Sequence, residues 1–224
     1  VDLLTDELRQ RVYIANYMLD QIDVYSIRER RFLPPVRVGN RPIQMAMVNP
    51  FTMVVANSGS EAISVIDLES LQETRQIQMA PVPLNATPLF PRSIAASSNA
   101  VLFTVIPLPA TAGTAPGNGS VWQLSLATGT SFPRLNLGGN AINVINGRNV
   151  LRAPDNGSAI VLAEGNGTLR LYDPVSDSFA ITRTAAFTAF RGSVSATADG
   201  NFFIVDDTIF NSVLAAREIG RAHV

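Results

Sequence analysis

The chain has 224 residues, and 46% of them are hydrophobic, which is enough apolar content to build the core of one sizeable domain. A formal net charge of -1 leaves no positive excess to neutralise phosphates, so nucleic acid is not an expected partner. The apolar runs are too short for a membrane-spanning helix of roughly 20 residues, and the absence of cysteine excludes disulfides, thiolate metal sites and cysteine nucleophiles.

The first half of the chain contains a repeat. Residues 12–16 (VYIAN) recur as 53–57 (MVVAN), and each run is followed by a second one, 22–27 (IDVYSI) and 63–68 (ISVIDL). The separation of about 41 residues is typical of one blade of a propeller.

Within the clearest unit, β-branched residues dominate short runs that turn residues separate, which predicts antiparallel strands. We expect strands at 43–48, 52–57, 62–67 and 74–79, with a turn at Asn49-Pro50. A four-stranded unit cannot bury both of its faces alone, so the units must pack side by side around an axis. The predicted fold class is therefore all-β, a β-propeller of four-stranded antiparallel blades.

Later copies of the repeat are looser. They comprise 101–103 with 121–124, 160–163 with 169–173, and a final run at 203–205. Between the second and third strands of one unit, the Pro-, Gly- and Ala-rich stretch 107–119 predicts a long loop. We count about three full blades and two partial ones.

These motifs resemble the YVTN-type β-propellers, whose units run roughly G-x-x-P, an apolar strand, P-D-G, L-Y-V-A-N and V-S-V-I-D. The segments that match are 39–42 (GNRP), 54–57 (VVAN) and 63–67 (ISVID). The resemblance implies a ring of seven blades, of which this chain would hold only part. It also implies a bacterial protein with a periplasmic or extracellular location.

The chain begins at Val1, so neither a start nor a signal peptide is visible. Residues 218–224 (EIGRAHV) resemble a sequencing adaptor translated in frame. We interpret 1–217 as a partial propeller domain and 218–224 as a non-native tail, so that His223, the only histidine, is not counted as a functional residue.

Arginine recurs just before the first predicted strand of four units, at Arg41, Arg92, Arg148 and Arg191. In a propeller the first strand of each blade lines the central channel, so these residues are predicted to surround one mouth of it. Asn57 and Glu61, at the end of a strand and in the next loop, complete the candidate site. The arginines either attract an anionic ligand or join blades by pairing with a carboxylate or carbonyl of the adjoining blade, for example Glu61 or Asp20.

Other motifs favour structural roles. The glycine-rich stretches 113–119 and 165–167 lack the residues of a phosphate loop and are typical of turns. Four N-glycosylation patterns, at Asn85, Asn118, Asn156 and Asn166, mostly coincide with Asn-Gly turns. Residues 28–31 (RERR) predict a solvated hairpin tip, and 206–207 (DD) a loop opening after a strand. Asp206-Asp207, Asp20 with Asp23, and Glu61 could contribute to acid/base chemistry or to a hard cation site, but turn formation is the favoured role.

The sequence therefore predicts a binding module that recognises a protein, a glycan or a small anionic ligand through loops at the channel mouth. The alternative is a propeller enzyme of lactonase-like or quinoprotein-like type, with its catalytic residues in blades outside this chain. No cofactor, metal site or catalytic residue is predicted. The ligand, the oligomeric state and the presence of enzyme activity are left open.

Overall fold

The computed structural model describes residues 2–79, 88–107, 118–134, 145–185 and 190–217. Three features of the sequence lie outside these ranges: the Asn85 glycosylation pattern, most of the long loop at 107–119, and the tail 218–224 with His223. Within the described ranges there are twenty strands and no helix, and hence no helix that could cross a membrane.

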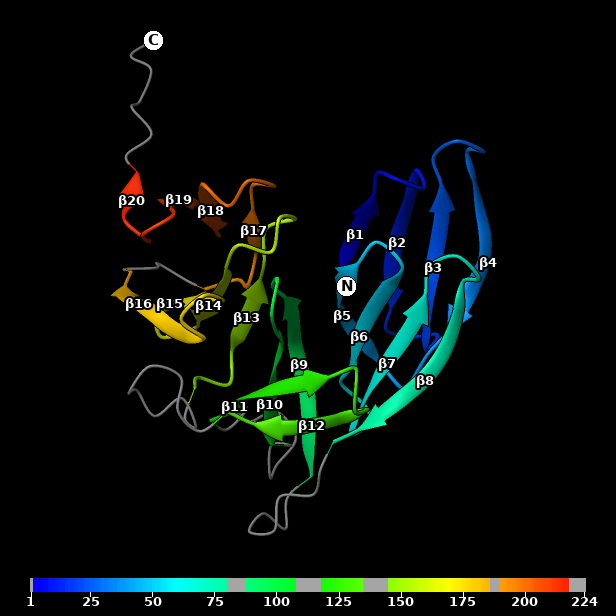
Figure 1. Cartoon of the computed structure of the whole chain (residues 1–224), viewed down its shortest axis with the longest axis horizontal. Coiled ribbons are helices and arrows are strands. Elements are labelled where there is room, and N and C mark those ends of the chain that lie inside the picture. The colour runs from blue at the N-terminus through cyan, green and yellow to red at the C-terminus, as the bar shows by residue number, and fades with distance from the viewer. Residues whose placement is uncertain (1, 80–87, 108–117, 135–144, 186–189, 218–224) are drawn as a thin grey trace.

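The strands form five antiparallel sheets of four strands each, in which chain order is also spatial order (Figure 1). The sheets are β1 (Leu3–Asp6), β2 (Arg11–Asn16), β3 (Gln21–Ser26) and β4 (Arg31–Arg37); β5 (Pro42–Asn49), β6 (Thr52–Asn57), β7 (Ala62–Asp67) and β8 (Gln72–Gln78); β9 (Leu89–Ala96), β10 (Val101–Pro107), β11 (Ser120–Ser125) and β12 (Thr130–Pro133); β13 (Asn149–Arg152), β14 (Ile160–Glu164), β15 (Thr168–Asp173) and β16 (Ser178–Thr184); and β17 (Val194–Ala196), β18 (Phe202–Val205), β19 (Thr208–Asn211) and β20 (Ala216–Arg217).

The predicted fold class is confirmed. The four strands expected between residues 43 and 79 are β5 to β8, with bounds within two residues of the prediction. The predicted total of five units also agrees with the structure, but the two units expected to be partial have four strands like the others. Strands such as β1 and β20, with four and two residues, are too short to leave a recognisable pattern in the sequence.

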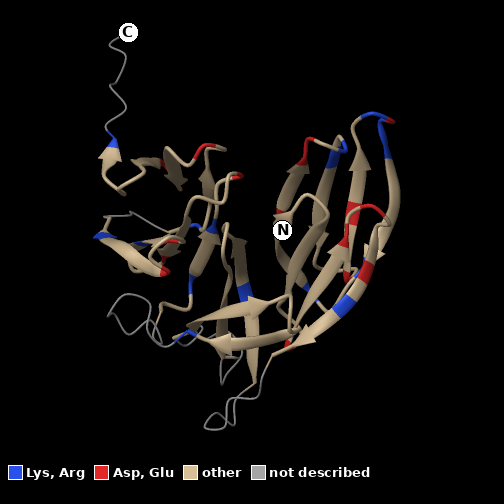
Figure 2. Ribbon diagram, viewed as in Figure 1, with Lys and Arg blue, Asp and Glu red and all other residues tan. Residues whose placement is uncertain are grey.

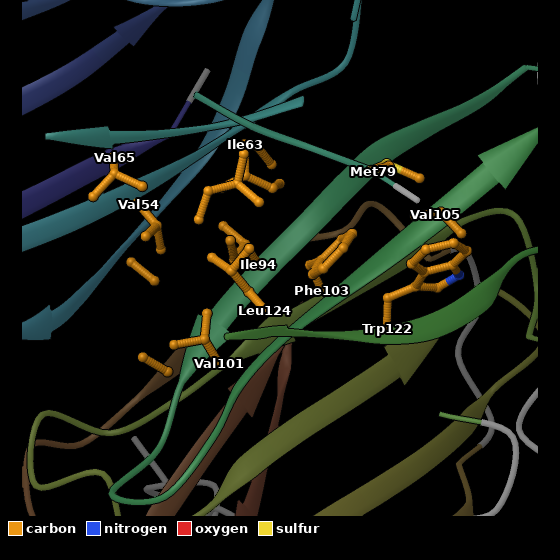
Figure 3. Close-up of a cluster of buried hydrophobic side chains, with 14 of the residues drawn as sticks. Val54, Ile63, Val65, Met79, Ile94, Val101, Phe103, Val105, Trp122 and Leu124 are labelled. Atoms are coloured by element: carbon orange, nitrogen blue, oxygen red, sulfur yellow. The ribbon is translucent and has the colours of Figure 1, made fainter. Parts of the chain in front are cut away.

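The first strand of each sheet lies near the common centre, and adjacent sheets pack face to face (Figure 1). Each interface has its own apolar cluster, so the core is divided into four layers between the five sheets. In the layer between the second and third sheets, Val54 and Ile63 lie against Ile94 and Phe103 (Figure 3). All four are at most 1% exposed, which is why the sheets hold together without helices.

Buried polar side chains join the inner strands β5, β9 and β13. The Gln44 amide donates to the Leu151 carbonyl at 2.7 Å and accepts a hydrogen bond from the Ser93 hydroxyl. The Ser93 hydroxyl in turn accepts a hydrogen bond from the Leu151 amide at 2.7 Å. These bonds fix the spacing of three neighbouring sheets around the centre.

The first and last sheets flank a sector that no further sheet of the described residues fills (Figure 1). The outward face of the first sheet is consequently open to solvent. Leu3 on β1 is 56% exposed, whereas Met45, at the corresponding place on β5, is 1% exposed because the first sheet covers it.

Candidate functional site

The predicted arginines lie where the chain enters, or has just entered, the first strand of a sheet. Arg41 and Arg148 directly precede β5 and β13, and Arg191 lies shortly before β17. Arg92 does not precede its strand as predicted but lies inside β9, because β10 extends to Pro107 and pairs there with Leu89. These entries lie on the same side of the molecule as the loops between the second and third strands of each sheet. We call this side the entry face.

Carboxylates on the entry face bind backbone amides at these entries. Asp20, in the loop between β2 and β3, accepts a hydrogen bond from the backbone amide of Arg41 at 2.8 Å. Asp206, between β18 and β19, accepts from the amides of Arg191 and Ser193 at 2.9 and 3.0 Å. These bonds hold the turns, and Arg41 and Asp206 both adopt positive φ, of 54° and 52°.

The same pattern recurs at the two other entries. Glu61, in the loop between β6 and β7, accepts a hydrogen bond from the amide of Leu89 at 3.2 Å. Glu164, at the end of β14, accepts from the amide of Asn146 at 2.8 Å and also pairs with Arg170. Neither Glu61 nor Asp20 forms an ion pair with an arginine among the described residues, so the carboxylate pairing predicted for them is not found there.

The guanidinium groups of Arg41, Arg92, Arg148 and Arg191 form no ion pair with a carboxylate in the described part of the chain. The Arg41 guanidinium lies over the Tyr17 ring, 5.6 Å from its centroid. That stacking orients the group but leaves its hydrogen-bond donors available.

A cavity of about 340 Å³ lies among the inner strands, and we call it the channel cavity. Its walls come from the first strands of all five sheets or the residues just before those strands: Asp2, Ile43, Gln44, Arg92, Asn149, Val150, Arg152, Gly192, Ser193 and Val194. Of the four predicted arginines, Arg92 alone lines this cavity.

The two arginines of the channel cavity differ in their partners. Arg152 donates to Asp2 at 2.9 Å and, through Nε, to the Val194 carbonyl at 3.1 Å. Arg92 makes no hydrogen bond or ion pair with another residue for which the structure gives a position. Arg92 remains exposed to solvent, and partial desolvation by the surrounding protein lowers the pKa of its guanidinium from the ordinary value, which the nearby Tyr17 opposes. Arginine starts from so high a pKa that the group stays charged at neutral pH.

Asn57 and Glu61 do not line the channel cavity. Asn57 is fully buried, and its amide donates to the Ala62 carbonyl and to the Ser64 hydroxyl, at 3.2 and 2.8 Å. It packs so closely on Gly39 that a Cβ there would come within 2.5 Å of the Asn57 amide nitrogen. Asn57 thus supports the entry turn, and Glu61 is exposed on the entry face.

The remaining candidates have local structural partners. Residues 28–31 form the predicted hairpin tip, where Arg31 pairs with Glu29. Asp23 accepts hydrogen bonds from the side-chain amides of Asn16 and Gln21. Across the described ranges no three acidic or histidine side chains gather as a metal site would require. Basic and acidic residues are interspersed over the sheets and turns (Figure 2).

Sequence reasoning missed most residues of the site, among them Tyr17, Asp2 and Arg152. Tyr17 follows the repeated strand 12–16 and could have been noticed as the aromatic residue of an entry-face loop. The Asp2–Arg152 pair joins residues 150 positions apart and leaves no trace in the repeat.

Five four-stranded antiparallel sheets around a common centre define a β-propeller. No known protein family matches the sequence, and no curated protein matches it either. Among solved structures, Hydrazine Synthase of Kuenenia stuttgartiensis resembles the chain with a TM-score of 0.64 at 17% identity, over 94% of this chain and 64% of that one. At this identity the likeness shows the fold alone, and the chain spans less than two thirds of the length of that relative. The similarity to YVTN-type repeats stays an interpretation of the motifs.

Proposed function

We propose that the chain is a β-propeller binding module that takes a small anionic ligand at its entry face. The observation that supports this is that the acidic side chains of the entry face bind backbone amides and do not pair with the arginines. Asp20, Glu61 and Asp206 bind backbone amides, which leaves the guanidinium groups of the entry face without described carboxylate partners. Unpaired guanidinium groups around one opening attract anions and bind carboxylate, sulfate or phosphate groups in a fork geometry.

The same chemistry covers an anionic group carried by a protein or a glycan. The enzyme alternative, of lactonase-like or quinoprotein-like type, has no specific observation in its favour among the described residues, and it is kept only as the alternative. The periplasmic or extracellular location also stays a prediction.

The test is calorimetric titration with citrate at several salt concentrations. We expect binding that weakens as salt rises, because exposed charges are screened. Replacing Arg41 and Arg92 together by alanine should weaken binding by about tenfold or more, since a hydrogen bond to a charged group contributes about 1.5–3 kcal/mol. The matched control is Arg28→Ala with Arg30→Ala, which removes the same charge from the hairpin tip between β3 and β4. Equal affinity in the two double variants would contradict the proposal.

A further inference from the structure

The channel cavity carries one uncompensated charge. Each oxygen of the Asp2 carboxylate accepts a hydrogen bond, one from Arg152 at 2.9 Å and one from the backbone amide of Met45 at 2.9 Å. Asp2 and Arg152 therefore neutralise each other inside the wall. Arg92 is left as the cation without a described partner, so the charge available to a ligand is a single positive one.

The neutral polar groups of the wall are already engaged. The Gln44 amide bonds to Leu151 and Ser93, and the Asn149 side chain accepts from Thr104 at 2.6 Å and donates to the Asn146 carbonyl at 2.8 Å. A sugar or another polyol needs many free donors and acceptors, and these two side chains offer few. Recognition in this cavity consequently depends on charge and shape.

Part of the wall is apolar. Ile43 and Val150 line the cavity. Each packs at the edge of an apolar layer between two sheets and is only partly buried there. Gly192 lies beside Val150 at a positive φ of 84°, and a Cβ there would meet only the Val150 methyl, at 3.6 Å. The missing side chain leaves space next to Val150, and a hydrocarbon group could cover that surface favourably.

We infer that the channel cavity holds a small aliphatic monocarboxylate, whose carboxylate pairs with Arg92 and whose hydrocarbon part lies against Ile43 and Val150. This rests on the proposed function and specifies its ligand class. The cavity volume of about 340 Å³ is near the lower end of small-molecule sites, which span roughly 300–1,000 Å³. One positive charge favours a monoanion over a dianion, because a second carboxylate would have to desolvate against Ile43 and Val150 without a counter-charge.

Three probes of similar length test the inference by calorimetry: valerate, its neutral amide valeramide, and the dianion glutarate. We expect valerate to bind at least about tenfold more tightly than valeramide, which cannot form the charge-assisted bond. Glutarate should also bind at least about tenfold more weakly than valerate. Glutarate binding more tightly than valerate would overturn the inference.

Two variants locate the site. Arg92→Gln should remove the preference for valerate over valeramide, and it should leave the melting temperature nearly unchanged because Arg92 has no described hydrogen-bond partner. The matched control Arg28→Gln, which removes a charge at the hairpin tip between β3 and β4, should change valerate affinity by less than about threefold. Undiminished valerate binding in Arg92→Gln would refute the inference.

These outcomes also separate the two proposals. Salt-dependent citrate binding that the Arg41→Ala, Arg92→Ala variant abolishes, together with no preference for valerate, would leave the binding module standing and refute the monocarboxylate. Absence of any salt-dependent anion binding would refute both.

Discussion

At the scale of single residues, Asp206 shows how a charged side chain holds a turn. Its carboxylate accepts hydrogen bonds from the backbone amides of Arg191 and Ser193, while its own backbone has a φ of 52°. Aspartate is among the few residues that adopt this conformation readily, because its short polar side chain bonds to nearby backbone.

Replacing Asp206 by alanine should destabilise the protein by about 1–2 kcal/mol, because two amides lose their acceptor and alanine is disfavoured at positive φ. Asp206→Asn keeps the conformation and one acceptor oxygen and should cost less. Asp207→Ala is the neighbouring control and should stay within about 0.5 kcal/mol. Urea denaturation measures all three variants, and equal losses for Asp206→Ala and Asp207→Ala would contradict this account.

Tyr172 should make the stability of the protein depend on pH in the alkaline range. Its ring is fully buried, and its hydroxyl donates to Asp177 at 2.6 Å. Burial in the first place, and the hydrogen bond to Asp177 in the second, raise the pKa of Tyr172 above its ordinary value. A raised pKa in the folded state contributes stability that is present below the unfolded value of about 10 and is lost as pH rises beyond it.

The free energy of unfolding should therefore fall as pH rises above about 10, and Tyr172→Phe should make that fall shallower. Burial also raises the pKa of Tyr13, so the double variant with Tyr13→Phe should be shallower still. Denaturant titrations at a series of pH values measure how steeply the free energy of unfolding falls with pH. The difference between variant and parent at pH 7 gives the cost of the lost hydrogen bond itself. An unchanged slope in the double variant would show that neither tyrosine is responsible.

At the scale of the elements, Leu3 and Met45 occupy corresponding places on the inner strands β1 and β5. Their exposed fractions of 56% and 1% differ because only the second sheet has a neighbour on that side. Met45→Ala should cost about 2–5 kcal/mol, as large-to-small changes in a core do, whereas Leu3→Ala should cost less than about 1 kcal/mol.

Thermal and urea denaturation of the two variants check this comparison. The side chains have similar volume, so each is the control for the other. A cost for Leu3→Ala equal to that for Met45→Ala would mean that the outward face of the first sheet is covered in solution.

The strands were largely predictable from the sequence, because alternating β-branched residues and turn residues are local signals. The register of β9 was not, since it depends on how far β10 extends, and this placed Arg92 inside a strand rather than before it. The place of a residue in the repeat does not show whether its side chain is buried. Asn57, which was chosen in that way, is fully buried. The channel cavity depends on pairs such as Asp2 with Arg152, which only the folded chain brings together.

At the scale of the whole molecule, each sheet contacts mainly its neighbours, so the stability of the ends depends on single interfaces. The fifth sheet has strands of two to four residues and one apolar cluster, which it shares with the fourth sheet. The second sheet is packed on both of its faces.

Amide hydrogens of β18 and β19 should therefore exchange faster than those of β6 and β7, because local opening of the fifth sheet breaks fewer contacts than opening of the second. Hydrogen–deuterium exchange followed by mass spectrometry resolves these segments. The first sheet also lacks one neighbour but has longer strands, so its amides should exchange at an intermediate rate. Equal protection in all three sheets would indicate that the described blades unfold as one unit.

The attachment of the entry turns to acidic residues has a consequence for evolution. Each turn is held by a carboxylate close to the point where the inner strand begins, so the connection before it can change in length while that strand keeps its place. The connections from Gln78 to Leu89 and from Pro133 to Asn149 are much longer than the one from Arg37 to Pro42, although all three lead into an inner strand. Sequence variation can thus accumulate in these connections, and new ligand preferences can arise there without disturbing the five sheets.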